Sequence, residues 1–205
     1  MRRIRIFEHI SLDGVIQAPG GRKEDSEQGF PHGGWSAPFS SPESGKAIVA
    51  AHGTGYDLLL GRRTYDIWSA YWPRAERGPI ADGFNAATKY VATHRPDSLE
   101  WGPAKSIGPD LAGDIRRLKS TNGPDLILWG SSTLTPLLLQ HGLADEILLI
   151  VYPVLLGVGK RLFAEGTPPV TLSLKSSAPA PSGVVINSYA PAGPLQTGEA
   201  DASRR

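Results

Sequence analysis

The chain has 205 residues, a formal net charge of +1, 40% hydrophobic residues, 20% charged residues and no cysteine. Such a small net charge excludes a strong overall field for nucleic acid or a membrane surface, and the lack of cysteine excludes disulfide bonds, zinc–thiolate sites and a cysteine nucleophile. No apolar segment has the length of a signal-peptide core or a membrane span, so we expect a cytoplasmic protein with neither nucleic-acid nor membrane partners.

The N-terminal part of the chain combines a strand, a long loop and a capped helix. Residues 4–10, IRIFEHI, alternate apolar and polar side chains as a strand does. Residues 11–41 are rich in turn sequences and predict a loop long enough to suggest a functional role. A helix is predicted over residues 42–52, with Ser41 as its N-cap.

The remaining segments continue the alternation of strands and helices. In chain order they are a strand at 56–60, helices at 63–69 and 80–87, a strand at 89–93, a helix beginning near 109, a strand at 125–129, a helix ending at Gln140, a strand at 145–152 and an antiparallel pair at 171–177 and 184–189. This order predicts an α/β fold with a mainly parallel sheet. Residues 191–205 lack apolar periodicity, so we predict a single domain over residues 1–190 followed by a disordered tail.

Three predicted strands end in residues suited to binding phosphate. Their sequences are LLLG-RRTY, YVAT-HRP and LILW-GSST, and a helix follows the first and the third directly. Free N–H groups at a helix N-terminus bind phosphate, and arginine supplies planar donors for it. Each segment on its own is also typical of a turn, a helix cap or a solvated surface. Together, arginines at two strand ends favour a ligand with more than one phosphate, such as NADPH, although the Rossmann and P-loop glycine motifs are both absent.

Five segments in fixed order carry a resemblance to a known family. They are SLDGVI at 11–16, LLLGRRTYDIW at 58–68, KYVAT at 89–93, LILWGSSTLTPLLLQHGLADE at 126–146 and PVLLGVGKRLF at 153–163. The chain resembles the dihydrofolate-reductase-like superfamily, and within it the branch named for the C-terminal reductase domain of the bifunctional riboflavin-biosynthesis protein. The resemblance implies a three-layer α/β fold with about eight mainly parallel strands, an antiparallel C-terminal pair, and NADPH lying across the strand ends.

The resemblance also implies which residues hold the cofactor. Ile16 would lie beside the nicotinamide. The other expected cofactor-binding residues belong to the three strand ends: Gly61, Arg62, Arg63 and Thr64 on the pyrophosphate and 2′-phosphate side, Thr93, His94 and Arg95 on the adenosine side, and Gly130, Ser131, Ser132, Thr133 and Leu134 under the pyrophosphate.

The reaction implied is hydride transfer from NADPH to a C=N or C=O bond of a small pterin-like or pyrimidine-like heterocycle, and a proton donor is then needed. Candidates are Glu43, which is otherwise a favourable first-turn charge, and Asp13, which is otherwise a turn residue. Trp35 and Trp68 are expected to line the substrate site, unless they pack in the core. His9 alternates with Phe7 and is consistent with a satisfied interior histidine.

Several points stay open at this stage. The substrate could be 5-amino-6-(5-phosphoribosylamino)uracil of the riboflavin pathway, or the protein could bind a nucleotide or drug without turnover. The partner expected is a small molecule, with a homodimer possible. No spacing of histidine and acidic residues suggests a metal site.

Overall fold

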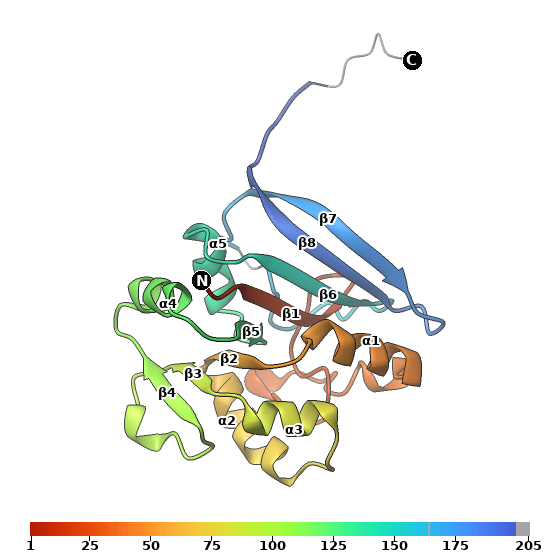
Figure 1. Cartoon of the computed structure of the whole chain (residues 1–205). Helices are drawn as coiled ribbons and strands as arrows, with labels where there is room; N and C mark the ends of the chain where they lie inside the picture. The colour runs from red at the N-terminus through yellow and green to blue at the C-terminus, as the bar shows by residue number, and fades with distance from the viewer. Residues whose placement is uncertain (164, 200–205) are drawn as a thin grey trace.

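An eight-stranded sheet forms the centre of the protein, in the strand order β4-β3-β2-β5-β1-β6-β8-β7 (Figure 1). The computed structural model describes residues 1–163 and 165–199. The strands are β1 (Ile4–Ser11), β2 (Tyr56–Gly61), β3 (Lys89–Ala92), β4 (Ala104–Ile107), β5 (Asp125–Trp129), β6 (Glu146–Tyr152), β7 (Val170–Pro179) and β8 (Val185–Pro194). Neighbours from β4 to β6 pair in parallel, whereas β8 is antiparallel to both β6 and β7. The predicted fold class is therefore confirmed.

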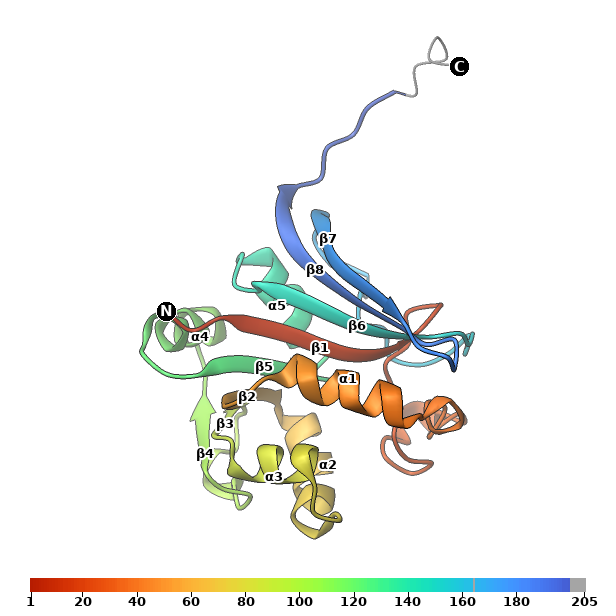
Figure 2. The ribbon, with the colours of Figure 1, turned by 45° about the vertical axis from the view of Figure 1, so that its right-hand side comes forward.

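Helices cover both faces of the sheet and make the fold three-layered (Figure 2). The helices are α1 (Pro42–His52), α2 (Arg62–Tyr71), α3 (Pro79–Ala86), α4 (Leu111–Ser120) and α5 (Leu134–Gln140). Side chains of α1, α2 and α3 pack with one core cluster, and those of α4 and α5 pack with the cluster on the opposite face. No helix within the described residues is long and apolar enough to cross a membrane.

The sequence of β5 shows why the central strands consist of continuous apolar runs. Leu126 and Leu128 enter the core beneath α4 and α5, whereas Ile127 and Trp129 enter the core beneath α1 and α2. A parallel strand covered on both faces has no solvent-facing side, so the side chains on both of its faces are apolar. The strand β1 follows the same rule with Ile6 on one face and Phe7 on the other.

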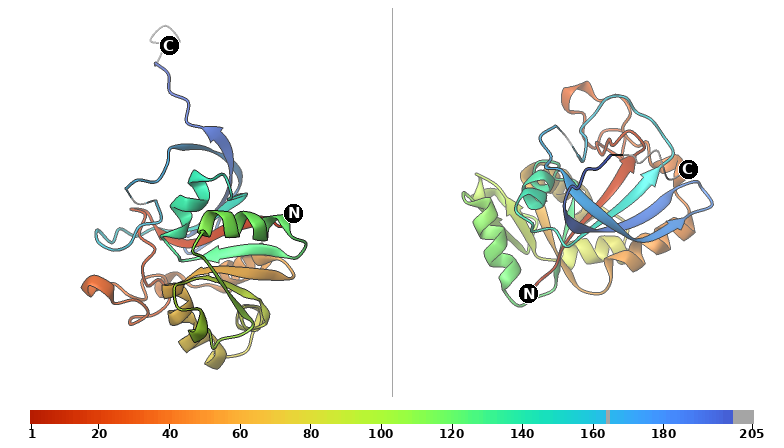
Figure 3. Two further views of the ribbon diagram at one scale, coloured as in Figure 1. Left: turned by 90° about the vertical axis from the view of Figure 1, so that its left-hand side faces the viewer. Right: turned by 90° about the horizontal axis from the view of Figure 1, so that it is seen from above.

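The structure differs from the sequence-based expectations at two places. The strand β4 was not predicted, because this edge strand has only four residues and two of them, Lys105 and Ser106, are exposed and polar. The predicted tail begins too early, because β8 extends to Pro194, which pairs with Val170 of β7. In Figure 3 the two blue C-terminal strands run side by side at one edge of the sheet. Backbone pairing with β7 needs no apolar periodicity, so residues 191–194 gave no strand pattern. Residues 200–205 of the predicted tail lie outside the described residues.

Candidate active site

Two adjoining cavities open where the parallel strands end. The larger, about 1050 Å³, is lined by the ends of β1, β2 and β5, by α1, α2 and α3, and by the loop after β1. The smaller, about 510 Å³, is lined mainly by residues that follow β3 and β4. The residues common to both are Gly61, Arg62, Arg63 and Thr133. The N-terminus of α2 thus lies at the junction of the two cavities, at the edge of the sheet where open α/β folds bind ligands.

Hydrogen bonds join the ends of β2 and β5 beneath this junction. The backbone N–H of Ser131 donates to Thr64 Oγ1 at 3.0 Å, and the N–H of Gly61 donates to Ser131 Oγ at 2.8 Å. Gly130 and Ser131 both adopt left-handed conformations, with φ of 57° and 53°. These hydrogen bonds to the hydroxyls of Thr64 and Ser131 fix the position of the turn.

The residues that follow Ser131 in the glycine turn line the cavities, and the last of them also belongs to the core. Ser132 and Thr133 line the larger cavity and form no side-chain hydrogen bond within the part of the chain that the structure describes. Leu134, the first residue of α5, is buried in the core and also lines the smaller cavity. Ser132 and Thr133 are therefore placed to offer side-chain hydroxyls to a ligand.

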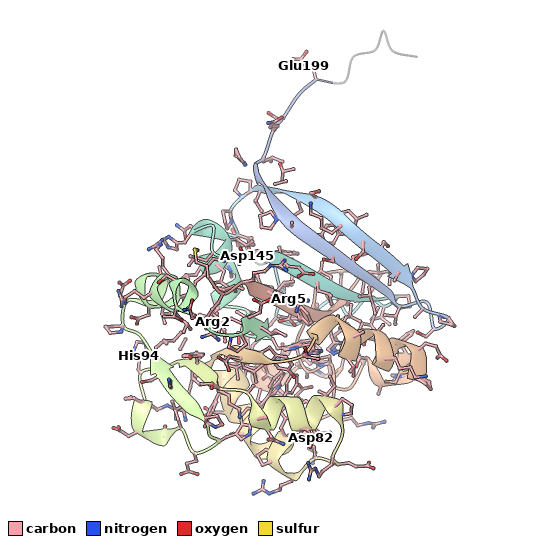
Figure 4. All side chains as sticks on the ribbon, in the orientation of Figure 1. Arg2, Arg5, Asp82, His94, Asp145 and Glu199 are labelled. Carbon is pink, nitrogen blue, oxygen red and sulfur yellow. The ribbon has the colours of Figure 1, made fainter. Side chains whose placement is uncertain are left out.

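The two adjacent arginines have different surroundings. Arg62 holds the segment after β3: its Nη1 donates to the Arg95 carbonyl at 3.0 Å and to Ser98 Oγ at 2.8 Å, and its Nε donates to Asp66 at 2.7 Å. The predicted adenosine-side residues Thr93, His94 and Arg95 line the smaller cavity, and His94 is exposed there (Figure 4).

Arg63 belongs to a cluster of opposite charges at the rim of the larger cavity. Its Nη2 lies 2.6 Å from Asp25 Oδ1, and its Nε lies 3.3 Å from Glu27 Oε2. Lys160 Nζ lies 2.6 Å from the other Asp25 oxygen and also contacts Glu27. Hydrogen bonds from Arg63 and Lys160 overcome the effect of burial and lower the pKa of Asp25 to about 2. Sequence reasoning missed this pairing, since nothing in the loop sequence indicates which cation Asp25 meets.

Glu8 is the acidic residue that the sequence analysis did not select. It lies near the carboxyl end of β1, is 2% exposed, and lines the larger cavity. Burial raises the pKa of its carboxyl well above the usual value of 4.5, a hydrogen bond from the Gly130 backbone opposes the shift only in part, and the charge of Glu24 adds to it. Its Oε1 has no hydrogen-bond partner among the described residues. Burial thus favours the protonated form of the Glu8 carboxyl, which is the form that a proton donor requires.

The two predicted acids lie outside the cavity. Glu43 is exposed in the first turn of α1, where its charge suits the helix N-terminus. Asp13 accepts hydrogen bonds from Ser11 Oγ at 2.6 Å and from the backbone N–H of Gly157 at 2.8 Å, and the Ser11 bond is the main cause of its pKa falling to about 2. Neither residue lines the cavity, so the structure does not support the prediction that they supply the proton.

The two predicted substrate-binding tryptophans lie in different places, and one of them lines the larger cavity. Trp35 is buried in the core, where its Nε1 donates to the Gln17 carbonyl at 2.8 Å, and it does not line either cavity. Trp68 does line the larger cavity and stacks on Phe84 with ring centroids 4.6 Å apart. Trp72 packs against the same phenyl ring. The cavity therefore has an aromatic wall on α2 and α3 that suits a flat ligand.

Ile16, the residue expected beside the nicotinamide, lies in the loop after β1, next to the charge cluster. It is buried, lines the cavity, and its backbone N–H donates to the Lys160 carbonyl at 2.8 Å. Among the described residues, no group of three or more histidine, cysteine, aspartate or glutamate side chains could hold a metal ion.

Comparison with known proteins decides the family. A model of the RibD C-terminal domain matches residues 2–186. The chain belongs to the RibD C-terminal domain family. Among solved structures with a similar fold is a putative riboflavin biosynthesis protein from Shewanella sp. PV-4. It has a TM-score of 0.68 and 18% sequence identity to this chain, and the match covers 93% of this chain and 99% of that one. The sequence-based resemblance is therefore confirmed.

Two further similarities extend this result. Dihydrofolate reductase from Enterococcus faecalis, solved as a complex with NADP(H), has a TM-score of 0.59 and 15% identity, over 92% of this chain and 96% of that one. The uncharacterized protein YyaP of Bacillus subtilis is 29% identical over 132 residues, which is 62% of this chain and 70% of YyaP. The RibD C-terminal domain and dihydrofolate reductase thus share their fold with this chain.

Proposed function

We propose that the protein is an NADPH-dependent reductase that transfers a hydride to a C=N or C=O bond of a small, flat heterocycle. The main support for this proposal is that two cavities adjoin at the N-terminus of α2. A dinucleotide has two ring systems joined by a pyrophosphate. The larger cavity suits the nicotinamide together with a substrate, and the smaller cavity suits the adenosine.

The residues at the junction fit the phosphates of such a cofactor. No side chain caps the N-terminus of α2, so the N–H groups of its first turn remain available to an anion. Gly130 has no side chain to block the turn beside them, and a Cβ there would lie 2.9 Å from Thr64 Oγ1. The 2′-phosphate that distinguishes NADPH from NADH was expected beside Arg62 and Arg63, but Arg62 is bound to the segment after β3 and Arg63 to Asp25. His94 and Arg95 are exposed at the smaller cavity and would hold this phosphate instead, with Arg95 exchanging its 3.0 Å ion pair with Asp66 for the phosphate.

Glu8 is proposed as the proton donor. When bound, the reduced nicotinamide supplies the hydride. The Glu8 carboxyl would give its proton to the substrate nitrogen or oxygen while the neighbouring carbon receives the hydride, so the substrate would gain two hydrogens. The carboxylate left behind is unfavourable in its buried position, which drives it to regain a proton from water after product release.

The cofactor can be tested by calorimetry with NADPH and NADH. We expect wild type to bind NADPH at least about tenfold more tightly, and Arg95→Ala to lose most of that preference while keeping its NADH affinity. Arg77→Ala is the matched control, because this exposed arginine pairs with Asp82 and lines neither cavity. Failure to bind either nucleotide would refute the proposal.

The two alternative functions remain separate predictions. A riboflavin-pathway reductase needs a cation for the phosphate of its substrate, and Arg63 and Lys160 in the larger cavity are already paired with Asp25 and Glu27. Turnover of 5-amino-6-(5-phosphoribosylamino)uracil would establish that function. A binding protein without activity would hold NADPH tightly and consume none of it with any pterin, pyrimidine or imine.

A further inference from the structure

Charged and apolar residues line different parts of the larger cavity. Apart from Glu8, the charged residues of its lining belong to the loop after β1, to the first turn of α2 and to Lys160. Within the described chain, α1, α3 and the part of α2 beyond its first turn contribute no aspartate, glutamate, lysine or arginine to this lining. These three helices lie on the same face of the sheet (Figure 2), so their uncharged residues form one continuous side of the cavity.

The rings on this side hold one another in place. Phe84 of α3 is buried and stacks on Trp68 of α2 with ring centroids 4.6 Å apart. The His52 ring, at the end of α1, lies 5.6 Å from the same phenyl ring, and its Nε2 accepts a hydrogen bond from Trp129 Nε1 at 3.1 Å. Burial lowers the pKa of His52 from its usual 6.5, so this ring is also uncharged near pH 7.

The cavity extends from the buried end of β1 to the surface of the protein. Glu8, at its inner end, is 2% exposed, whereas Tyr71, which lines it on α2, is 60% exposed. A heterocycle that reaches the Glu8 carboxyl therefore has its outer part between α1 and the rings of α2 and α3. A phosphate or carboxylate in that position would lose its hydration without gaining a cation, which is unfavourable.

Gly45 of α1 leaves space at the outer end of this region. Gly45, Ile48 and His52 lie on one face of α1, and all three line the larger cavity. Gly45 has an ordinary helical φ, and a Cβ there would meet no atom of the described residues within 4 Å. Neither the backbone nor the packing thus requires glycine, although glycine destabilises a helix relative to alanine.

Two other glycines within helices differ from Gly45 in this respect. A Cβ at Gly83 of α3 would lie 2.5 Å from the Tyr56 hydroxyl, and a Cβ at Gly113 of α4 would lie 2.0 Å from a carboxylate oxygen of Asp110. Both positions therefore exclude a side chain because of their protein neighbours. At Gly45 the space that a side chain would fill belongs to the mouth of the cavity.

We propose that the substrate carries an uncharged apolar or aryl group that lies between α1 and the rings of α2 and α3, and that Gly45 admits this group. The inference rests on the proposed function in taking the occupant of the cavity to be the substrate. It makes Gly45 a specificity-determining residue, and it disfavours a substrate whose substituent is a sugar phosphate.

The class of substituent can be tested by calorimetry with three ligands that share one ring and no added nucleotide. The ligands are 2,4-diaminopyrimidines with a benzyl, a methyl or a phosphonomethyl group at position 5. We expect the benzyl compound to bind about tenfold or more tightly than the methyl compound, because its ring is buried against apolar side chains. The phosphonomethyl compound should bind more weakly than both. No binding of the benzyl compound, or equal or tighter binding of the phosphonate, would overturn the proposal.

The role of Gly45 can be tested with Gly45→Leu and its matched control Ala47→Leu. Ala47 is an exposed residue of α1 that lines neither cavity. Gly45→Leu should lose most of the preference for benzyl over methyl, Gly45→Ala should lose less, and Ala47→Leu should keep it. All three variants should unfold at or above the urea concentration of wild type, since leucine and alanine favour a helix at least as well as the residues that they replace or nearly so.

A benzyl preference in Gly45→Leu equal to that of wild type would overturn the role of Gly45. A loss of stability in Gly45→Ala would do the same, because it would show that the protein itself requires glycine there. NADPH takes part in none of these measurements. Their failure is therefore distinct from failure of the reductase proposal, which depends on nucleotide binding.

Discussion

Gly130→Ala tests whether the glycine turn is built as the structure shows. Gly130 has φ of 57°, in the left-handed region, and a Cβ placed there would lie 2.9 Å from Thr64 Oγ1 and 3.3 Å from Thr64 Cγ2. An alanine must therefore adopt an unfavourable backbone conformation and also displace Thr64. That displacement breaks the 3.0 Å hydrogen bond from the Ser131 N–H to Thr64 Oγ1.

The size of the effect follows from these two terms. A left-handed conformation costs an alanine roughly 1–2 kcal/mol. Loss of the buried hydrogen bond adds about 0.5–1.5 kcal/mol. We expect the free energy of unfolding to fall by about 2–3 kcal/mol in Gly130→Ala. NADPH affinity should fall as well, because the turn lines the larger cavity.

Urea denaturation followed by tryptophan fluorescence would measure this, with Gly142→Ala as the control. Gly142 has nearly the same φ, 60°, but a Cβ there would meet nothing within 4 Å. The control should lose only the roughly 1–2 kcal/mol of the backbone term and keep its NADPH affinity. Equal losses of stability in the two variants would show that Thr64 does not restrict the turn, and the reasoning would fail.

Three other predictions concern charged groups. Because the pKa of Glu8 is raised in the folded state, its contribution to stability is present below about pH 4.5 and is lost as the pH rises. In urea titrations at several pH values, Glu8→Gln should make this loss of stability smaller. The exposed control Glu43→Gln should leave it unchanged. Asp57→Ala should lower the free energy of unfolding by about 3–5 kcal/mol at any salt concentration, because it leaves the buried charge of Arg2 without its partner. A loss below about 1 kcal/mol would contradict this. The lowered pKa of Asp13 contributes stability that is lost as the pH falls from about 3.8 towards 2, so the stability difference between wild type and Asp13→Asn should shrink over that range.

The sequence predicted the sheet better than it predicted the groups facing the ligand. Strands such as β2 and β5 are recognisable because both of their faces are buried, and the glycine turn at Gly130 is recognisable because its position follows a strand. The tertiary partner of a charged side chain has no comparable signal. Arg63 was expected to bind the cofactor phosphates, which stays a prediction; it lines the larger cavity, but its contacts with Asp25 and Glu27 depend on how a long loop returns to the sheet.

Glu8 shows what kind of signal was available and overlooked. Glu43 and Asp13 stand at a helix start and in a turn, where a carboxylate has an ordinary structural explanation, and both have that explanation in the structure. Glu8 instead shares a face of β1 with Ile6 and Ile10, which are buried in the core. A carboxyl group at an inward position of an apolar strand is costly unless it is neutral or paired, so its presence in IRIFEHI already required a special environment. Its place near the carboxyl end of a central parallel strand gives the reason, since that edge of the sheet holds the ligand cavity.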